Sequence, residues 1–173
     1  TDDEDLYLRA SSLQDHGRKP QTFWIQEIGQ KYKMSNVQAA IGLGQLRRSE
    51  NQIFRKRRIR EWYEEELADL EGLEFQEDSE GNLGINWMNS IRVRGWSAGD
   101  RQNLMAFLGS FGIDSRPVFP PMSQFPIWGY SGRQQPVSVE IGQSGVNLPS
   151  GVSLSRQSVR RVANTVRDFL GRG

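Results

Sequence analysis

The hydrophobic pattern of the sequence changes at about Leu70, and this change limits what the chain can fold into. From Val37 to Leu70 the apolar residues recur at helical spacing, which predicts helix. Beyond Leu70 the pattern alternates between the period of strands and that of helices. The elements expected there are a strand at 85–94, a helix at 98–111, a strand at 113–119 and a helix at 154–170. Helices that alternate with the strands of a small sheet indicate the α/β class, with an α+β arrangement after Leu70.

A first helix is expected over about residues 2–14. Thr1 can cap it, and Glu4 stands three residues later, which is the spacing of a capping box. Gly17 follows the helix, where glycine suits the left-handed backbone of a C-terminal cap. Because the chain opens on a helix cap without a methionine, we expect it to be part of a longer protein.

A second helix is expected to begin after Ser35, which has Gln38 three residues later as another capping box. The helical pattern continues to Leu70, either as one helix or as two with a break at 49–51. The start of this helix, AAIGLG, is rich in small residues, and each internal glycine costs about 1 kcal/mol relative to alanine. We therefore expect it to pack closely against a neighbour. Its glycines lie inside a helix and so do not form a phosphate-binding loop.

A basic run from Arg55 to Arg60 precedes an acidic run in the same helical stretch. At i,i+4 spacing Arg57 can reach Glu61 and Arg60 can reach Glu64, so the charges can offset each other locally. We interpret the stretch as a solvated helix face. The alternative is a helical module that binds nucleic acid or a partner protein through the basic run.

The composition excludes several kinds of site. The chain has no cysteine and one histidine, which excludes disulfides, thiolate metal sites and multi-histidine metal sites. Its formal net charge of +1 gives no field that would attract nucleic acid, and no run of about 18 apolar residues predicts a membrane span. We expect no metal, no nucleic acid, no membrane partner and a cytoplasmic location.

Few residues could carry chemistry. His16 could act as an acid or base, but it stands near a helix end, where a donor ring is favourable in any case. Arg116 lies between a strand and a proline-rich loop, where it could bind a ligand or be solvated. Lys31 and Lys33 are either solvated charges of a turn or anion-binding groups.

Four segments, in order along the chain, resemble the DegT/StrS-type nucleotide-sugar aminotransferases. GQKYKMSNVQAAIGLGQL, at 29–46, resembles the family signature G-x-N-Y-R-M-(S/T)-x-(L/I)-Q-A-A-(I/L)-G-x-x-Q-L. LQDHG, FGIDSRPVFPPMSQFPIW and SGVNLPSGVSLSRQSVRRV resemble motifs on either side of it. KYKM and NLPS are most similar to the GDP-perosamine synthase branch.

The resemblance implies a homodimeric pyridoxal phosphate enzyme of the aspartate aminotransferase fold (fold type I). Such an enzyme moves an amino group, usually from glutamate, to a keto-sugar nucleotide. The family's Schiff-base lysine lies upstream of the matched region, so no catalytic residue is expected in this chain, and the chain should be inactive alone. The implied parts are a remnant of the large domain at 1–34, a connecting helix region at 35–71 and the small C-terminal domain at 72–173.

The resemblance also assigns site residues. Lys31 takes the position of a family asparagine that reaches the cofactor phosphate of the other subunit, and lysine can serve there as a point charge. Lys33 replaces a family arginine. Arg116 and His16 stand in matched motifs and are expected to bind the substrate. A non-catalytic relative of the fold and the nucleic-acid or partner-binding module stay open as alternatives.

Overall fold

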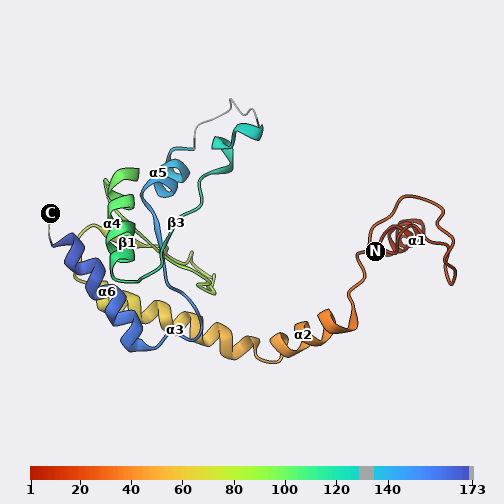
Figure 1. The fold of residues 1–173 in the computed structure, drawn as a ribbon, viewed down its shortest axis with the longest axis horizontal. Coiled ribbons are helices and arrows are strands. Elements are labelled where there is room, and N and C mark those ends of the chain that lie inside the picture. The colour runs from red at the N-terminus through yellow and green to blue at the C-terminus, as the bar shows by residue number, and fades with distance from the viewer. Residues whose placement is uncertain (129–134, 172–173) are drawn as a thin grey trace. The chain divides into compact units, whose positions relative to one another are not determined.

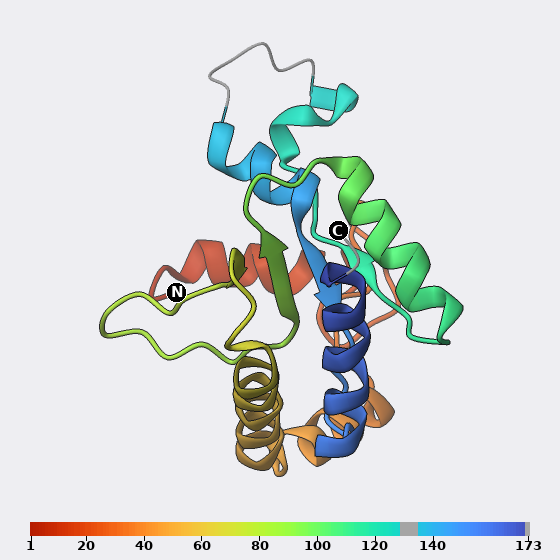
Figure 2. The ribbon, with the colours of Figure 1, turned by 90° about the vertical axis from the view of Figure 1, so that its left-hand side faces the viewer.

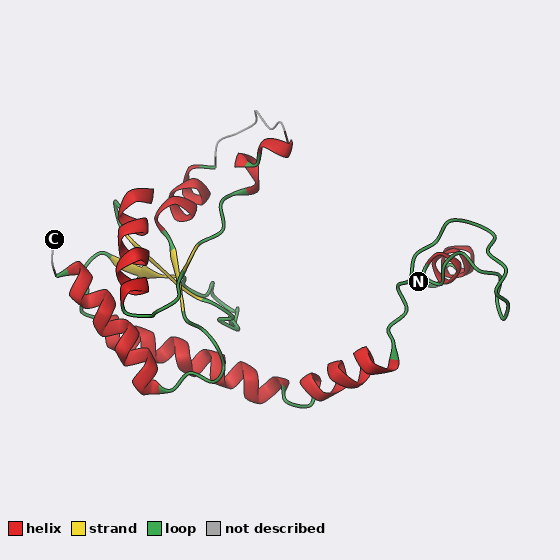
Figure 3. Ribbon diagram, viewed as in Figure 1, coloured by secondary structure: helices red, strands yellow, loops and turns green. Residues whose placement is uncertain are grey.

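The computed structural model describes residues 1–128 and 135–171, and its chain divides into two compact units, Thr1–Ser49 and Glu50–Gly173 (Figures 1 and 3). The first unit contains helices and an irregular segment, and the second contains a small sheet with helices around it. Within the described ranges, no helix is both long and apolar enough to cross a bilayer.

The first unit begins with helix α1, Glu4–Leu13. Its cap is Asp3, whose Oδ1 accepts a hydrogen bond from the Leu6 N–H at 2.9 Å. The expected capping box of Thr1 and Glu4 is therefore wrong, and the Thr1 hydroxyl accepts from the Asp3 N–H instead. An aspartate cap combines the hydrogen bond with a negative charge at the positive end of the helix dipole.

Helix α2, Asn36–Leu46, starts as predicted. The Ser35 hydroxyl accepts from the Gln38 N–H, and the Gln38 side chain accepts from the Ser35 N–H. Helix α3, Ser49–Leu67, follows after a break at 47–48, so two helices are present, with the break just ahead of the predicted place. None of the residues of α2 is buried.

The second unit contains a four-stranded antiparallel sheet (Figure 2). Its strands, in the spatial order β1-β2-β4-β3, are β1 Leu73–Phe75, β2 Asn89–Val93, β4 Val146–Leu148 and β3 Arg116–Pro117. Both predicted strands are shorter than expected. Ile85 and Trp87 lie ahead of β2 and are more than half exposed, so the alternation at 85–88 does not belong to a strand.

Helices α4, Ala98–Ser110, and α6, Arg156–Leu170, form where the sequence predicted them. The sequence missed α5, Pro136–Ser144, and the strand β4 that follows it. The proline-rich loop expected after Arg116 corresponds to residues 120–136, and it contains two 3-10 turns, Met122–Gln124 and Pro126–Trp128. The rest of that expectation, at 129–134, lies outside the described residues.

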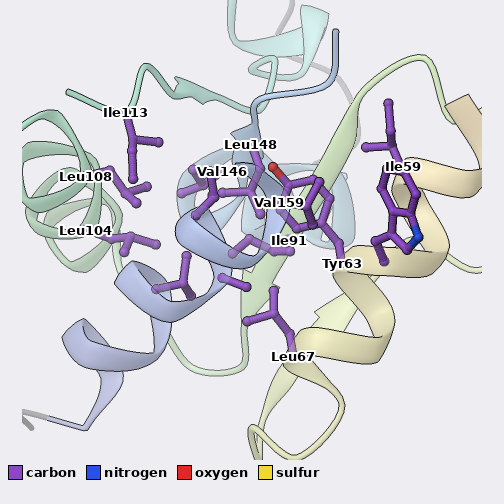
Figure 4. Packing of buried hydrophobic residues seen from close by; sticks show 14 residues of the cluster. Ile59, Tyr63, Leu67, Ile91, Leu104, Leu108, Ile113, Val146, Leu148 and Val159 are labelled. Atoms are coloured by element: carbon purple, nitrogen blue, oxygen red, sulfur yellow. The ribbon is translucent and has the colours of Figure 1, made fainter. Parts of the chain in front are cut away.

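The core of the second unit lies between the sheet and helices α3, α4 and α6 (Figure 4). Tyr63 is fully buried, and its hydroxyl donates to the Pro149 carbonyl at 2.9 Å. The helix expected to reach residue 111 ends at Ser110, because Phe111 is 45% exposed and the chain buries Ile113 just beyond the helix instead. The buried apolar residues are Ile59, Trp62, Tyr63, Leu67, Ile91, Leu104, Leu108, Ile113, Val146, Leu148, Val159, Val162, Ala163 and Val166.

The basic run of α3 is not a solvated face, because most of its side chains bond to backbone carbonyls far along the chain. The Arg57 Nε donates to the Gly84 carbonyl at 3.0 Å, and the expected pair with Glu61 is formed by Arg58 instead. Lys56 donates to the carbonyls of Trp87 and Ser150, and burial lowers its pKa. The predicted pair of Arg60 with Glu64 is present, but Arg60 is only 6% exposed. These cations fix loops, which disfavours a nucleic-acid surface here.

Candidate functional site

The segment at 26–33 lies against the C-terminal end of α1 and presents the turn that carries the two lysines. The Gln30 N–H donates to the Leu13 carbonyl at 2.7 Å, and the Tyr32 N–H donates to the Gln14 carbonyl at 2.9 Å. The His16 N–H returns a bond to the Gln30 carbonyl at 3.1 Å. The last carbonyls of a helix have no partner within it, so these bonds both complete the helix end and fix the backbone of the turn.

Two glycines permit this close approach. A Cβ on Gly29 would lie 2.2 Å from the Gly17 nitrogen and 2.7 Å from the Leu13 oxygen. Gly17 has a φ of +65°, and a Cβ on it would lie 2.1 Å from the Glu27 oxygen. Side chains cannot be accommodated at either position without moving backbone. The sequence identified Gly17 as a helix cap, but the need for Gly29 becomes visible only in the structure.

Asp15 stands at the centre of the charges of this region. One carboxylate oxygen accepts from the Lys33 ammonium at 2.7 Å, and the other accepts from the Arg18 guanidinium. Lys33 and then Arg18 stabilise the carboxylate, which lowers the pKa of Asp15 to about 2. The backbone of Asp15 also forms an antiparallel bridge with that of Lys31. Sequence reasoning did not select Asp15, because its partners are brought to it by the fold.

The structure gives the two lysines of the turn different roles. Lys33 is bound to Asp15, whereas the exposed Lys31 ammonium has no ion pair or hydrogen bond within residues 1–128 and 135–171. A lysine whose backbone is fixed, and whose ammonium has no partner among the described residues, can bind an anion without first breaking an ion pair. Lys31 is therefore the better-placed anion-binding group of the turn.

His16 lies beside this turn, two residues beyond the cap of α1. Its φ of +62° is uncommon for a residue with a side chain. It lines a shallow hollow of about 470 Å³ together with residues 25–29. His16 and Lys31 are thus brought into one substructure, joined through the bond from the His16 N–H to the Gln30 carbonyl.

Arg116 belongs to the second unit, on strand β3. Its guanidinium lies 3.2 Å from Asp114, and both side chains are about three-quarters exposed. An exposed ion pair of this kind contributes little to stability and exchanges readily for another partner. Arg116 is therefore available to a ligand, as the sequence left open.

A larger groove of about 1080 Å³ lies over β1 and β2 in the second unit. Several of its charged groups are paired with each other, among them Arg60 with Glu64. Glu74 accepts from both Arg92 and Arg94, and Arg92 also reaches Glu140. Among the described residues no group of three or more histidine, aspartate or glutamate side chains could hold a metal ion. We therefore take the turn beside α1 as the candidate site.

Known proteins resemble the chain along almost its whole length. The GDP-perosamine synthase of Escherichia coli O157:H7 is 32% identical over 170 residues, which are 98% of this chain and 46% of that protein. EpsN of Bacillus subtilis (strain 168), provisionally named as a pyridoxal phosphate-dependent aminotransferase, is 25% identical over 94% of this chain and 43% of its own length. The chain thus spans just under half the length of these relatives.

The fold agrees with the sequence match. The crystal structure of the aminotransferase TlmJ from Streptoalloteichus hindustanus superposes with a TM-score of 0.85 at 25% identity, over 99% of this chain and 46% of that one. This confirms the expected aminotransferase fold. The sequence profile of one family matches residues 1–167. The chain therefore belongs to the DegT/DnrJ/EryC1/StrS aminotransferase family.

Proposed function

We propose that the full-length protein containing this chain transfers an amino group from glutamate to a keto-sugar nucleotide such as GDP-4-keto-6-deoxymannose. The observation that carries this proposal is the family match over residues 1–167, and the name of the Escherichia coli relative supports the choice of sugar. The product would serve the synthesis of surface polysaccharide. The reaction would run in the cytoplasm, with which a chain without cysteine is compatible.

Pyridoxal phosphate is the cofactor of the proposed reaction, and the residues of the turn fit one part of it. A phosphate monoester carries nearly two negative charges and needs cationic or N–H donors. Lys31 offers an exposed ammonium on a fixed backbone. We propose that Lys31 binds the cofactor phosphate across a homodimer contact. When bound, the cofactor supplies the electron sink for amino-group chemistry.

The remaining parts of the proposal concern the substrate and the assembly. We assign residues 1–34 to the large domain, 35–71 to the connecting helix region and 72–173 to the small domain. His16 and Arg116 would contact the nucleotide sugar. Helix α2 would lie at the dimer contact, which is supported by its exposed apolar side chains and by the open space around Gly42 and Gly44.

The test is an assay of the full-length protein with pyridoxal phosphate, glutamate and GDP-4-keto-6-deoxymannose, with the product identified by mass spectrometry. A dTDP-linked 4-keto-6-deoxyglucose serves as the comparison substrate. We expect the amino sugar from the GDP substrate, and no product from the 173-residue chain alone. Failure of glutamate to donate to any keto-sugar nucleotide would contradict the reaction, whereas preference for the dTDP substrate would contradict only the choice of sugar.

A further inference from the structure

The turn contains two lysines that the local chain does not distinguish. Lys31 and Lys33 stand two residues apart, so their long side chains could both reach one anion. Two neighbouring lysines on long, flexible side chains could bind the anion in more than one geometry. Each would also lose many rotamers on binding, which costs free energy. A single binding geometry therefore needs a third group that determines which ammonium is free to bind the anion.

Asp15 is positioned to determine which of the two ammonium groups is free. Its Oδ2 lies 2.7 Å from the Lys33 ammonium, and its Oδ1 bonds to Arg18. Its side chain is 19% exposed, whereas that of Lys33 is 52% exposed, so the carboxylate is the sheltered member of the pair. The Asp15 backbone bridges that of Lys31, and the neighbouring Gln14 carbonyl accepts from the Tyr32 N–H. Asp15 thus holds the turn through both its backbone and its side chain.

We infer that Asp15 is a positioning residue that binds Lys33 to itself and so presents Lys31 alone to the anion. The inference rests on the proposed binding of the cofactor phosphate by Lys31. It differs from a simple effect of charge. If only net charge mattered, removal of the Asp15 carboxylate would favour a nearby anion and removal of the Lys33 ammonium would disfavour it. If the ion pair of Asp15 with Lys33 matters, both changes weaken binding. Without Asp15 the freed Lys33 ammonium competes with Lys31, and without Lys33 the Asp15 carboxylate can pair with Lys31, to whose backbone it is bridged.

The experiment titrates the full-length apoprotein with pyridoxamine phosphate, which binds without a covalent bond. The variants are Asp15→Asn, Lys33→Gln, Lys31→Ala and the double variant of Asp15 and Lys31. Lys31→Ala should weaken binding about 10- to 150-fold, the loss of one charge-assisted hydrogen bond. Asp15→Asn and Lys33→Gln should each weaken it about 2- to 10-fold. In the first variant the freed Lys33 side chain must be ordered, and in the second Lys31 must leave Asp15 before it binds the anion. In the Lys31→Ala background, Asp15→Asn should not weaken binding further.

The matched control is the exposed ion pair of Asp69 with Arg167 in the second unit, where Asp69→Asn and Arg167→Gln should leave affinity unchanged. Thermal unfolding of every variant reports global damage. Opposite changes for Asp15→Asn and Lys33→Gln would overturn the inference in favour of net charge. An equal effect of Asp15→Asn with and without Lys31 would also overturn it. If Lys31→Ala alone left affinity unchanged, the proposed role of Lys31 would fail instead.

Discussion

Replacement of Gly29 by alanine should release the lysine turn from the end of α1. The added Cβ would lie within 2.7 Å of backbone atoms of Leu13, His16 and Gly17, which cannot give way as a side chain can. The displaced segment would lose up to three backbone bonds: Gln30 to Leu13, His16 to Gln30 and Tyr32 to Gln14. At about 0.5–1.5 kcal/mol each, their loss amounts to about 1.5–4.5 kcal/mol of local opening free energy.

Hydrogen exchange of the amides of His16, Gln30 and Tyr32 measures this directly. Exchange through local opening should accelerate about 10- to 2000-fold, since 1.4 kcal/mol is a factor of ten. The matched control is Gly109→Ala, where the new Cβ would have no neighbour within 4 Å and should stabilise α4 by about 0.5–1 kcal/mol. Unchanged exchange at Tyr32 in Gly29→Ala would refute the reasoning that this glycine fixes the turn.

Three further outcomes are expected. Because the pKa of Asp15 is lowered to about 2, its ion pairs contribute fully above the unfolded value of about 3.9 and are lost as the pH falls through about 2; a carboxyl ¹³C titration should show this midpoint, and Lys33→Gln should raise it. Ile41→Glu places a charge on the exposed apolar face of α2 and should shift the full-length protein toward monomer in sedimentation; an unaltered dimer would place the contact elsewhere. Arg60→Ala removes a guanidinium that lies 4.3 Å from the Phe75 ring centroid and bonds to the Gln76 carbonyl. It should lower the free energy of unfolding in urea by about 1.5–3 kcal/mol, whereas Arg58→Ala, whose side chain is far less buried, should lower it by less than about 1 kcal/mol.

Elements specified by neighbouring residues could be predicted from the sequence. The capping box of Ser35 with Gln38 needs only residues three apart, and it forms as predicted. Helix α6 has an apolar stripe that spans its whole length, and it is found as expected. The family signature likewise lies in contiguous segments, so the resemblance follows from the order of residues alone.

Elements that depend on residues far away in the sequence could not be predicted from the sequence. Strand β4 has three residues, too few for a period, and all are buried because β2 and β3 flank it. Asn147 can be buried in this strand although it is polar, because its side chain bonds to Ser90 and to the Pro117 carbonyl. Helix α5 begins in a proline-rich segment that suggests a loop, yet its Gly142 packs against Phe119 and Pro121, and the Gly142 carbonyl accepts from Arg101.

The candidate site likewise has features that the sequence predicts and features that only the folded chain determines. The order of residues alone indicates that Lys31 and Lys33 stand in a turn ahead of a capped helix, and the motif selects Lys31. That Lys33 is bound and Lys31 is not depends on the folded chain, because the deciding carboxylate, Asp15, lies 18 residues before Lys33 in the sequence. Charges that far apart meet only when Gly17 and Gly29 allow two backbone segments to touch, and that contact is set by folding rather than by local pattern.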